Sequence, residues 1–342
     1  MGLHPVDRED GDRAVTASLE TVDAGFLDAT IADGAERTGD RRLDTVVRVE
    51  YSSVNFKDAL ALTGARGVVR RFPLIAGIDL TGTVLSTSDP RWCDGDLVTL
   101  NGAGLGETLH GGLAGRAHVD GSRLVRVPAT MTPRHAAALG TAGFTAMLAV
   151  LRIERHGVAP DDGPVLVTGA SGGLGSLAVS LLSAAGYRVT ASTGRVDAQS
   201  RFLRELGATD VVDRSEFSEP GSALQTQRWA AVVDAVGGPT LVNAVAQTRH
   251  GGIVAACGNA QSADYAGSVF PFILRGVTLA GINSVEATPA ERDDAWRRLE
   301  RDMDLAALDG MTSVVPLSAA REVADRTLAG RGRGRTVVET GG

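Results

Sequence analysis

The feature that most constrains the fold is a glycine-rich turn in the middle of the chain. Residues 165–168 read Val-Leu-Val-Thr, an apolar run typical of a strand buried on both faces of a sheet. The turn Gly-Ala-Ser-Gly-Gly-Leu-Gly follows at 169–175, and a helical pattern then runs to Ala185, where Gly186 ends it. A strand, a tight turn and a helix in this order predict a βαβ unit of a parallel, doubly wound sheet.

The same turn also carries a binding motif. Three small residues occupy the positions of a G-x-G-x-x-G fingerprint, with Ala in place of the first Gly, so the backbone can approach a pyrophosphate at the helix N-terminus. Such a string alone can be an ordinary glycine turn, but the strand before it and the helix after it supply the context that a dinucleotide site requires. We therefore expect cofactor contacts from Ala170, Ser171, Gly172, Gly173, Leu174 and Gly175.

The residues after the second predicted strand of this unit indicate which dinucleotide binds. NAD enzymes usually carry an acidic residue here, which binds the ribose 2′-hydroxyl. This chain has Thr193, Gly194 and Arg195, with no carboxylate before Asp197. A hydroxyl and a guanidinium suit a 2′-phosphate, so the segment predicts NADPH, and Arg214 after the third strand could bind the same phosphate. The alternative is that both arginines are solvated surface side chains.

Strand and helix signals alternate through the middle of the chain, whereas both ends read as short strands. We expect residues 127–306 to form the nucleotide-binding domain, inserted into a β-rich domain built from residues 1–126 and 307–342. An Ala-rich helix is predicted over 133–151, and a charged helix over 289–308.

Composition excludes several classes of protein. With 342 residues, 43% apolar and 22% charged, the chain is neither disordered nor fibrous. A net charge of −7 argues against nucleic-acid binding. Cys93 and Cys257 lie far apart, which excludes a disulfide framework and a Cys-rich zinc site. The start has no apolar signal-peptide core and no apolar run reaches 18 residues, so we expect a soluble, cytoplasmic protein without a membrane partner.

Six motifs, spread over nearly the whole chain, resemble the medium-chain dehydrogenase/reductase superfamily. They are most similar to its zinc-free, quinone-oxidoreductase-like subfamily, which includes acrylyl-CoA reductase. The resemblance implies a Rossmann-type sheet inserted into a β-rich GroES-like domain. The motifs are S-S-x-N-F-K-D-A-L at 52–60, R-R-F-P-L-I-A-G-I-D at 70–79, G-T-A-G-F-T-A-M at 140–147, V-T-G-A-S-G-G-L-G-S at 167–176, P-F-I-L-R-G-V at 271–277 and G-R-T at 334–336.

The resemblance also implies the chemistry. Zinc-containing relatives carry a Cys on the loop that holds Asn55, Gly-His-Glu where this chain has Gly-Ile-Asp at 77–79, and a four-Cys lobe, and this sequence has none of these. The implied reaction is hydride transfer from NADPH to the β-carbon of an enoyl thioester such as acrylyl-CoA, or of an enone, without zinc. A quinone as the small-molecule substrate, and a non-catalytic NADPH-binding protein, are the alternatives.

Two catalytic positions follow from the resemblance. Asn55 would donate to the developing oxyanion or contact the nicotinamide ribose; otherwise it is a turn asparagine. Phe56 stands where relatives carry Tyr, so if that hydroxyl is their proton donor, water or another group must serve here. Lys57 and Asp58 read equally well as a functional pair or as a surface ion pair.

The resemblance also implies cofactor contacts from Thr141, Ser284 and Arg335. Cys257 and Gly258 are expected to contact the cofactor because they follow a sheet strand, and open α/β sheets place ligands at the carboxyl ends of their strands. Thr141 would approach the nicotinamide half of the cofactor, or alternatively cap a helix. Cys257 reads as a small core residue near the cofactor rather than as a nucleophile.

An apolar segment at 271–279 precedes a predicted edge strand. In the superfamily that strand pairs across a two-fold axis, which implies a homodimer; the alternative is an ordinary core strand.

Overall fold

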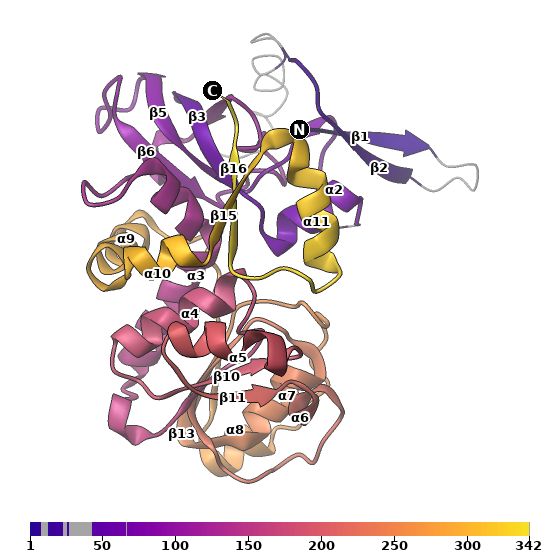
Figure 1. Ribbon diagram of the computed structural model, residues 1–342, viewed down its shortest axis with the longest axis vertical. Coiled ribbons are helices and arrows are strands. Elements are labelled where there is room, and N and C mark those ends of the chain that lie inside the picture. The colour runs from indigo at the N-terminus through magenta and orange to yellow at the C-terminus, as the bar shows by residue number, and fades with distance from the viewer. Residues whose placement is uncertain (8–12, 23–25, 27–42, 66, 342) are drawn as a thin grey trace. The chain divides into compact units, whose positions relative to one another are not determined.

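The computed structural model describes residues 1–7, 13–22, 26, 43–65 and 67–341 (Figure 1). The chain divides into two compact units. Unit 1 contains Met1–Thr141, Val285–Trp296 and Thr312–Gly342, and unit 2 contains Ala142–Ser284 and Arg297–Met311. The ends of the chain thus belong to one unit, and most of the middle forms the other. The first border falls after Thr141 rather than at residue 126.

Unit 1 is built on a seven-stranded sheet of order β15-β16-β3-β5-β6-β8, with β7 paired to β3. The C-terminal strand β16 runs antiparallel to β3, so the last strand of the chain joins the sheet that begins at Thr45. Alternate side chains of β3, including Val47 and Val49, are fully buried in a core with Leu80 and Leu100. The strands are β3 (Thr45–Ser53), β5 (Asp79–Thr87), β6 (Leu97–Asn101), β7 (Arg116–Val119), β8 (Val125–Arg126), β15 (Thr312–Pro316) and β16 (Arg335–Glu339).

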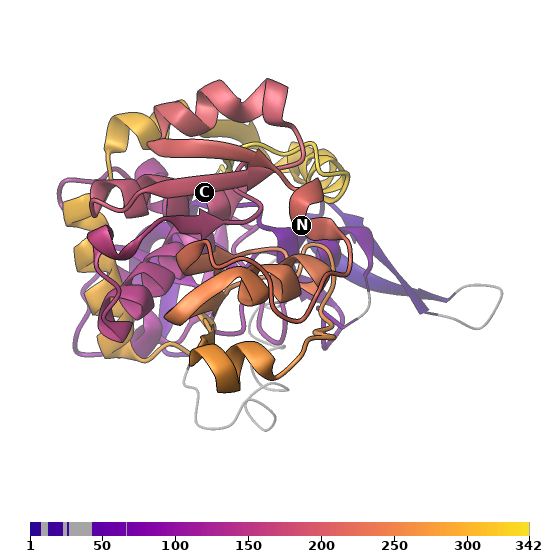
Figure 2. The ribbon, with the colours of Figure 1, turned by 90° about the horizontal axis from the view of Figure 1, so that it is seen from below.

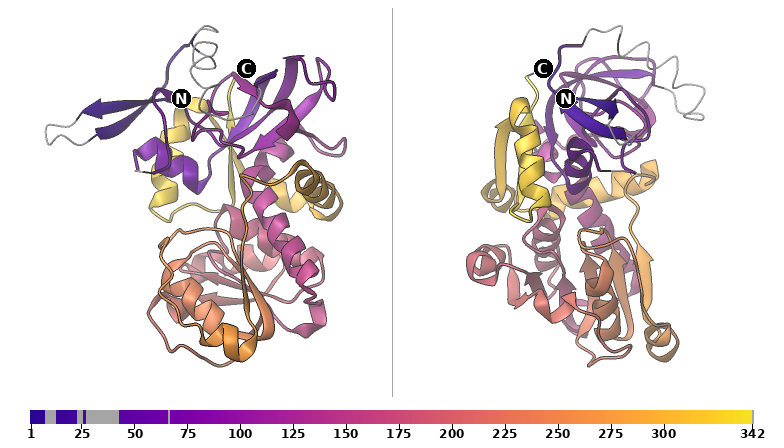
Figure 3. Two further views of the ribbon diagram at one scale, coloured as in Figure 1. Left: turned by 180° about the vertical axis from the view of Figure 1, so that it is seen from behind. Right: turned by 90° about the vertical axis from the view of Figure 1, so that its right-hand side faces the viewer.

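Unit 1 also contains a smaller sheet and two packed helices. The sheet has the order β2-β1-β4. Helices α2 and α11 pack against each other around Leu62 and Ala324 (Figure 3). The bounds are β1 (Gly2–Asp7), β2 (Arg13–Ser18), β4 (Leu74–Ile75), α2 (Phe56–Thr63), α11 (Ala320–Leu328), and the 3-10 turns η1 (Gly121–Arg123) and η3 (Leu317–Ala319).

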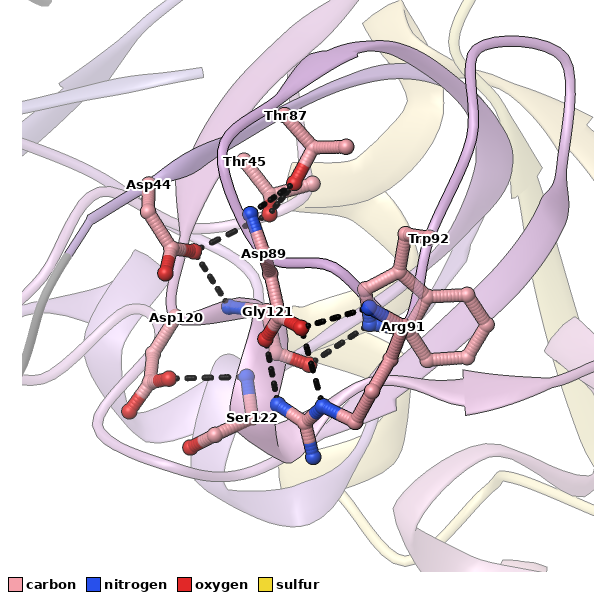
Figure 4. A network of polar contacts seen from close by, with 9 residues as sticks. All are labelled: Asp44, Thr45, Thr87, Asp89, Arg91, Trp92, Asp120, Gly121 and Ser122. Carbon is pink, nitrogen blue, oxygen red and sulfur yellow. Dashed lines mark hydrogen bonds and ion pairs between the residues drawn. The ribbon is translucent and has the colours of Figure 1, made fainter.

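A polar network joins the start of β3, the end of β5 and the turn η1 (Figure 4). Asp44 accepts hydrogen bonds from the Gly121 amide at 2.9 Å and from the Thr45 hydroxyl at 3.0 Å. The indole of Trp92 donates to the Gly121 carbonyl at 2.8 Å. A Cβ on Gly121 would lie 2.6 Å from the Thr45 hydroxyl, so glycine is required for this close approach. The network fixes the loops at one end of the large sheet.

Unit 2 is a six-stranded parallel sheet of order β11-β10-β9-β12-β13-β14. The central strands β9 and β12 are buried at every residue, which explains their continuous apolar runs. Chain order reverses at β9, so right-handed crossovers put α5 and α7 on opposite faces of the sheet (Figure 2). The strands are β9 (Val165–Val167), β10 (Val189–Thr193), β11 (Ala208–Asp213), β12 (Trp229–Asp234), β13 (Thr248–Ala256) and β14 (Thr278–Gly281). The helices between them are α4 (Gly173–Ala184), α5 (Val196–Glu205), α6 (Ser215–Ser218), α7 (Gly238–Gln247) and α8 (Phe270–Arg275). The 3-10 turn η2 (Pro160–Asp162) comes before β9.

The charged segment after β14 forms two helices rather than the single predicted helix. Helix α9 (Pro289–Asp302) is followed by a separate helix, α10 (Leu305–Gly310). Asp304, just before α10, accepts hydrogen bonds from the Ala306 and Ala307 amides. An N-cap of this kind starts a new helix. On α9, the buried guanidinium of Arg292 donates to the Asn101 carbonyl at 2.8 Å, which holds this stretch in unit 1.

Helix α3 (Pro133–His156) is broken at Gly140, where φ is 49° and ψ is −156°. Essentially only glycine adopts this backbone conformation. The break lies one residue before the border of unit 1. An 18-residue window of α3 has a mean hydropathy of 1.6, but 83% of it is buried inside the protein, so α3 is a core helix.

Candidate cofactor site and buried polar network

The glycine-rich turn of unit 2 adopts the strand-turn-helix geometry predicted for it. Gly169, at the end of β9, has a φ of 60°, and the Ala170 amide donates to the Ser192 carbonyl at 3.0 Å. Gly172 is the N-cap of α4 and offers no side chain to cap the helix. A Cβ on Gly175 would lie 2.3 Å from the Gly169 carbonyl oxygen. The uncapped, positively polarised helix start suits a phosphate group.

Polar side chains gather at the carboxyl ends of β9 and β10. The hydroxyls of Ser171 and Thr193 are buried and lie 3.1 Å apart. Arg195 donates from its backbone amide to the Thr193 hydroxyl at 3.3 Å, and from Nη2 to Ser171 Oγ at 3.4 Å. Directly after the neighbouring strand β11, the Arg214 amide donates to the Thr193 carbonyl at 3.1 Å. These side chains were predicted from sequence, and the fold brings them together beside the turn.

Two further predicted contacts follow β13 in unit 2. The Cys257 amide donates to the Asp234 carbonyl at 2.7 Å. Burial, followed by the Asp234 charge, raises the pKa of the Cys257 thiol, so the thiol stays protonated at neutral pH and is no activated nucleophile. A Cβ on Gly258 would lie 2.7 Å from the Ala235 carbonyl oxygen, so this backbone runs close to the end of β12. Ser284 is buried and is the last residue of the stretch 142–284.

In unit 1, Asn55 is the N-cap of α2, and its side chain is fully engaged. Nδ2 donates to Asp79 Oδ2 at 2.7 Å and to Asp58 Oδ2 at 3.0 Å, while Oδ1 accepts from Arg335 Nη1 at 3.1 Å. Arg335 can only donate, which fixes the orientation of the amide. Both amide hydrogens point at carboxylates, so Asn55 could donate to a substrate oxyanion only by leaving one of them.

Asp79, the first residue of β5, lies at the centre of this buried network. Its carboxylate accepts from the hydroxyl of Ser53 at 2.6 Å and from Asn101 Nδ2 at 2.9 Å. It also accepts from the hydroxyl of Thr141 at 2.6 Å and from the Thr141 backbone amide at 2.8 Å. Asp79 therefore caps the second half of α3. Thr141 is a predicted cofactor contact, but its hydroxyl donates its hydrogen to the Asp79 carboxylate.

Arg335 binds the end of the first half of α3, on the N-terminal side of the break at Gly140. Its guanidinium is buried; Nε donates to the Ala138 carbonyl at 2.6 Å and Nη2 to the Ser53 hydroxyl at 2.9 Å. Burial lowers the pKa of Arg335, and the charges of Asp79 and Asp58 oppose that shift. A cation at the C-terminal end of the first half of α3 and an anion at the start of the second complement the two helix dipoles. Like Thr141, Arg335 was expected to contact the cofactor, and all three guanidinium nitrogens donate to protein groups.

Asp58 is part of the same network, and sequence reasoning missed its role. It is buried, and its carboxylate accepts from the Asn55 amide and from the Ile78 amide, both at 2.8 Å. Burial first, and then the Asp79 charge, raise its pKa to about 7. The possible surface pair with Lys57 is wrong, because Lys57 binds Glu107 at 2.8 Å. The spacing N-x-x-D, which predicts a capping box, was the available signal.

Phe56, the other predicted catalytic position, also lies at the start of α2. Phe56 is the first residue of the helix, half-buried, and supplies no hydroxyl. Within the described residues, no three His, Cys, Asp or Glu side chains gather in a way that could hold a metal ion.

Two family models match the chain. The model for the alcohol dehydrogenase GroES-like domain covers residues 41–147, and the model named zinc-binding dehydrogenase covers residues 173–301. The first lies mostly in unit 1 and the second mostly in unit 2.

Curated relatives match over most of their length. The "Probable acrylyl-CoA reductase AcuI" of Escherichia coli is 42% identical over 97% of this chain and 98% of its own. The "Putative quinone oxidoreductase YhfP" of Bacillus subtilis is 43% identical over 75% of this chain and 78% of its own.

Solved structures agree with these matches. Escherichia coli YhdH, crystallised with bound NADPH, has a TM-score of 0.91 and 42% identity, covering 99% of both chains. Bacillus subtilis YhfP with bound NAD has a TM-score of 0.87 and 36% identity, also covering 99% of both chains. The nucleotide turn, the parallel sheet inserted into a GroES-like domain and these full-length matches lead to one conclusion: the chain belongs to the medium-chain dehydrogenase/reductase superfamily, in the group that includes the acrylyl-CoA reductases.

Proposed function

We propose that this protein is an NADPH-dependent reductase of activated C=C bonds, with acrylyl-CoA as the nearest named substrate. The observation that carries the proposal is the match, over nearly the full chain, to a relative named as an acrylyl-CoA reductase. The cluster of hydroxyls and guanidinium groups beside the nucleotide turn supports NADPH as the cofactor. An anionic 2′-phosphate needs such donors, whereas the 2′-hydroxyl of NADH usually meets a carboxylate.

The residues of unit 2 fit this cofactor. The start of α4 would hold the pyrophosphate, and Thr193, Arg195 and Arg214 would hold the 2′-phosphate. Gly175 allows α4 to approach the end of β9, because its Cβ would otherwise meet backbone atoms. Cys257, Gly258 and Ser284 are proposed to line the nicotinamide side at the carboxyl ends of the strands. When bound, NADPH supplies the hydride for the β-carbon of the substrate.

We propose that the reaction proceeds without zinc. The loop that carries a Cys in zinc relatives holds Asn55, and their Gly-His-Glu is Gly-Ile-Asp at 77–79, so Ile78 replaces the His. The polar atoms of Asn55 and Asp79 are already bound to each other and to Arg335 or Thr141. Because Phe56 offers no proton, the substrate α-carbon would be protonated by water or by another group. Elemental analysis of the purified protein tests the metal part, since stoichiometric zinc would contradict it.

Quinone reduction is the second candidate, supported by the similarity to YhfP. NADPH carrying deuterium at the transferred position separates the two. A C=C reductase should convert acrylyl-CoA to propionyl-CoA with deuterium at the β-carbon. A quinone reductase would leave the thioester unchanged and would produce hydroquinone instead. NADPH binding without turnover on thioesters, enones or quinones would favour a non-catalytic protein and refute both.

We also propose that the protein is a homodimer. Strand β14 is an edge of the unit 2 sheet, and the neighbouring segment exposes Val269, Phe270, Ile273 and Leu274 at 48–68% of their surface. An apolar patch beside an open strand edge suits pairing with a second copy. Light scattering after size exclusion should give twice the chain mass, and Ile273→Glu should shift it to the monomer. A monomeric wild type would contradict this.

A cytoplasmic location is proposed as well. Both cysteines are unpaired, as is usual in a reducing compartment. Fractionation of the producing cells tests this, and recovery from the periplasm or the membrane would contradict it.

A further inference from the structure

Gly194, between Thr193 and Arg195, lies under the side chain of Arg214. A Cβ on Gly194 would lie 2.5 Å from Arg214 Nε, 2.8 Å from Cδ and 2.9 Å from Cζ. Real Cβ atoms essentially never come this close to other heavy atoms. The end of the Arg214 side chain therefore occupies the volume that any other residue at position 194 would fill.

The Arg214 guanidinium lacks the ion-pair partners that Arg228 and Arg298, two other arginines of unit 2, have. In the part of the chain that the structure describes, it forms no hydrogen bond or ion pair, and the residue is exposed. On the same unit, Arg228 binds Glu216 at 3.0 Å and Arg298 binds Glu154 at 2.7 Å. Arg214 instead lies over the backbone that links the Thr193 hydroxyl to Arg195. The Ser215 amide first, and less strongly the charge of Arg214, lower the pKa of the neighbouring Asp213, whose carboxylate accepts from that amide at 2.8 Å. The Arg214 guanidinium is not bonded to this carboxylate, so it can bind an anion of a ligand.

We propose that Gly194 is a specificity-determining residue for the cofactor. By carrying no side chain, it lets Arg214 lie beside the Thr193–Arg195 segment, so that two guanidinium groups serve one 2′-phosphate. The inference rests on the proposed use of NADPH and extends it, since it names the residue that sets the preference for NADPH over NADH.

The position can be tested without damaging the fold. The φ of Gly194 lies outside the left-handed range, so alanine fits its backbone, and the atoms that alanine would meet belong to a flexible, exposed side chain. Gly194→Ala should therefore displace Arg214 and leave the sheet intact. Gly310→Ala is a matched control, because a Cβ there would meet nothing within 4 Å.

The experiment is isothermal titration of NADP⁺ and NAD⁺ into the wild type, Gly194→Ala, Arg214→Ala, the double variant and the control. We expect each single variant to bind NADP⁺ about tenfold more weakly, which corresponds to about 1.4 kcal/mol, with NAD⁺ changed less than about twofold. The double variant should be no weaker than Arg214→Ala alone, because both changes remove the same contact.

Two results would overturn the inference. One is an unchanged preference for NADP⁺ in Gly194→Ala, and the other is additive losses in the double variant. A wild type that binds NAD⁺ as tightly as NADP⁺ would refute the proposed cofactor itself, so the two failures are distinguishable. Equal circular dichroism spectra for all variants would show that the folds match; a loss of structure in Gly194→Ala alone would mean that the glycine is needed for folding and would also overturn the inference.

Discussion

Replacing Gly140 by alanine should destabilise the protein strongly, although in an ordinary helix the same change stabilises it. Helix propensity alone predicts a gain of about 1 kcal/mol for Gly→Ala inside a helix. Here the residue has a φ of 49° and a ψ of −156°, which is not a helical conformation. The sign of the effect therefore tests the break in α3.

The expected loss has two parts. Holding alanine in a glycine-only conformation costs about 1–3 kcal/mol. The added Cβ would also lie 2.6 Å from Asp79 Oδ2, 2.9 Å from the Ser53 hydroxyl and 3.0 Å from Arg335 Nη2. At least one of these buried groups must move, and breaking a buried charged interaction costs about 3–5 kcal/mol. We expect a total loss of about 4–8 kcal/mol in the free energy of unfolding.

Urea unfolding followed by circular dichroism measures this loss. Gly157→Ala is the matched control: Gly157 follows the same helix with a φ of 96°, but a Cβ there meets nothing within 4 Å. It should lose only the backbone cost of about 1–2 kcal/mol. Equal losses in the two variants would show that a Cβ at position 140 does not disturb the hydrogen bonds around Asp79. A stabilised Gly140→Ala would show that α3 is continuous.

Three other predictions concern single side chains. Arg195→Ala should raise the KM for NADPH at least tenfold, about 1.4 kcal/mol, and leave NADH use nearly unchanged; steady-state kinetics with both cofactors checks this, and equal effects would remove Arg195 from the 2′-phosphate site. The pKa of Asp58 is raised from 3.8 to about 7, so the stability that its protonated form contributes is present below pH 4 and is lost as the pH rises through 7. Relative to Asp58→Asn, the wild type should therefore lose up to about 4 kcal/mol of unfolding free energy between pH 4 and 8; a difference that does not vary with pH would contradict this. Cys257→Ser should leave kcat within about threefold of the wild type, because burial keeps the thiol protonated, and inactivation by this change would restore a chemical role for the sulfur.

The sequence was sufficient for the local signals of unit 2. A buried strand, a glycine-rich turn and a helix are contiguous in the chain, so the turn at 169–175 and the residues Thr193 to Arg195 could be identified from spacing alone. The limits of the units could not be obtained in this way. Residues 285–296 belong to unit 1 because Arg292 binds a carbonyl 191 positions away in the chain.

The polar network around Asp79 in unit 1 could not be predicted either, because its members lie far apart in the sequence. Asp79 begins a strand, and its partners come from β3, β6 and α3, while Arg335 is 280 positions from Asn55. Nothing local distinguishes this aspartate from one at a solvated strand end. The resemblance to relatives pointed to Thr141 and Arg335 as cofactor contacts, but not to the hydrogen bonds that hold them inside unit 1.

The crowding of acceptors and donors around Asp79 limits how this site can be redesigned. Introducing the cysteine of zinc-using relatives at position 55 would remove the amide that joins Asp58, Asp79 and Arg335. Two carboxylates would then face each other without their bridge, and the guanidinium would lose a partner. The Asp79 carboxylate already fills the space beside Gly140, since a Cβ there would lie 2.6 Å from its Oδ2. Converting this site to one that holds zinc would therefore require a concerted exchange of residues, and an engineer would have to transplant the whole set at once.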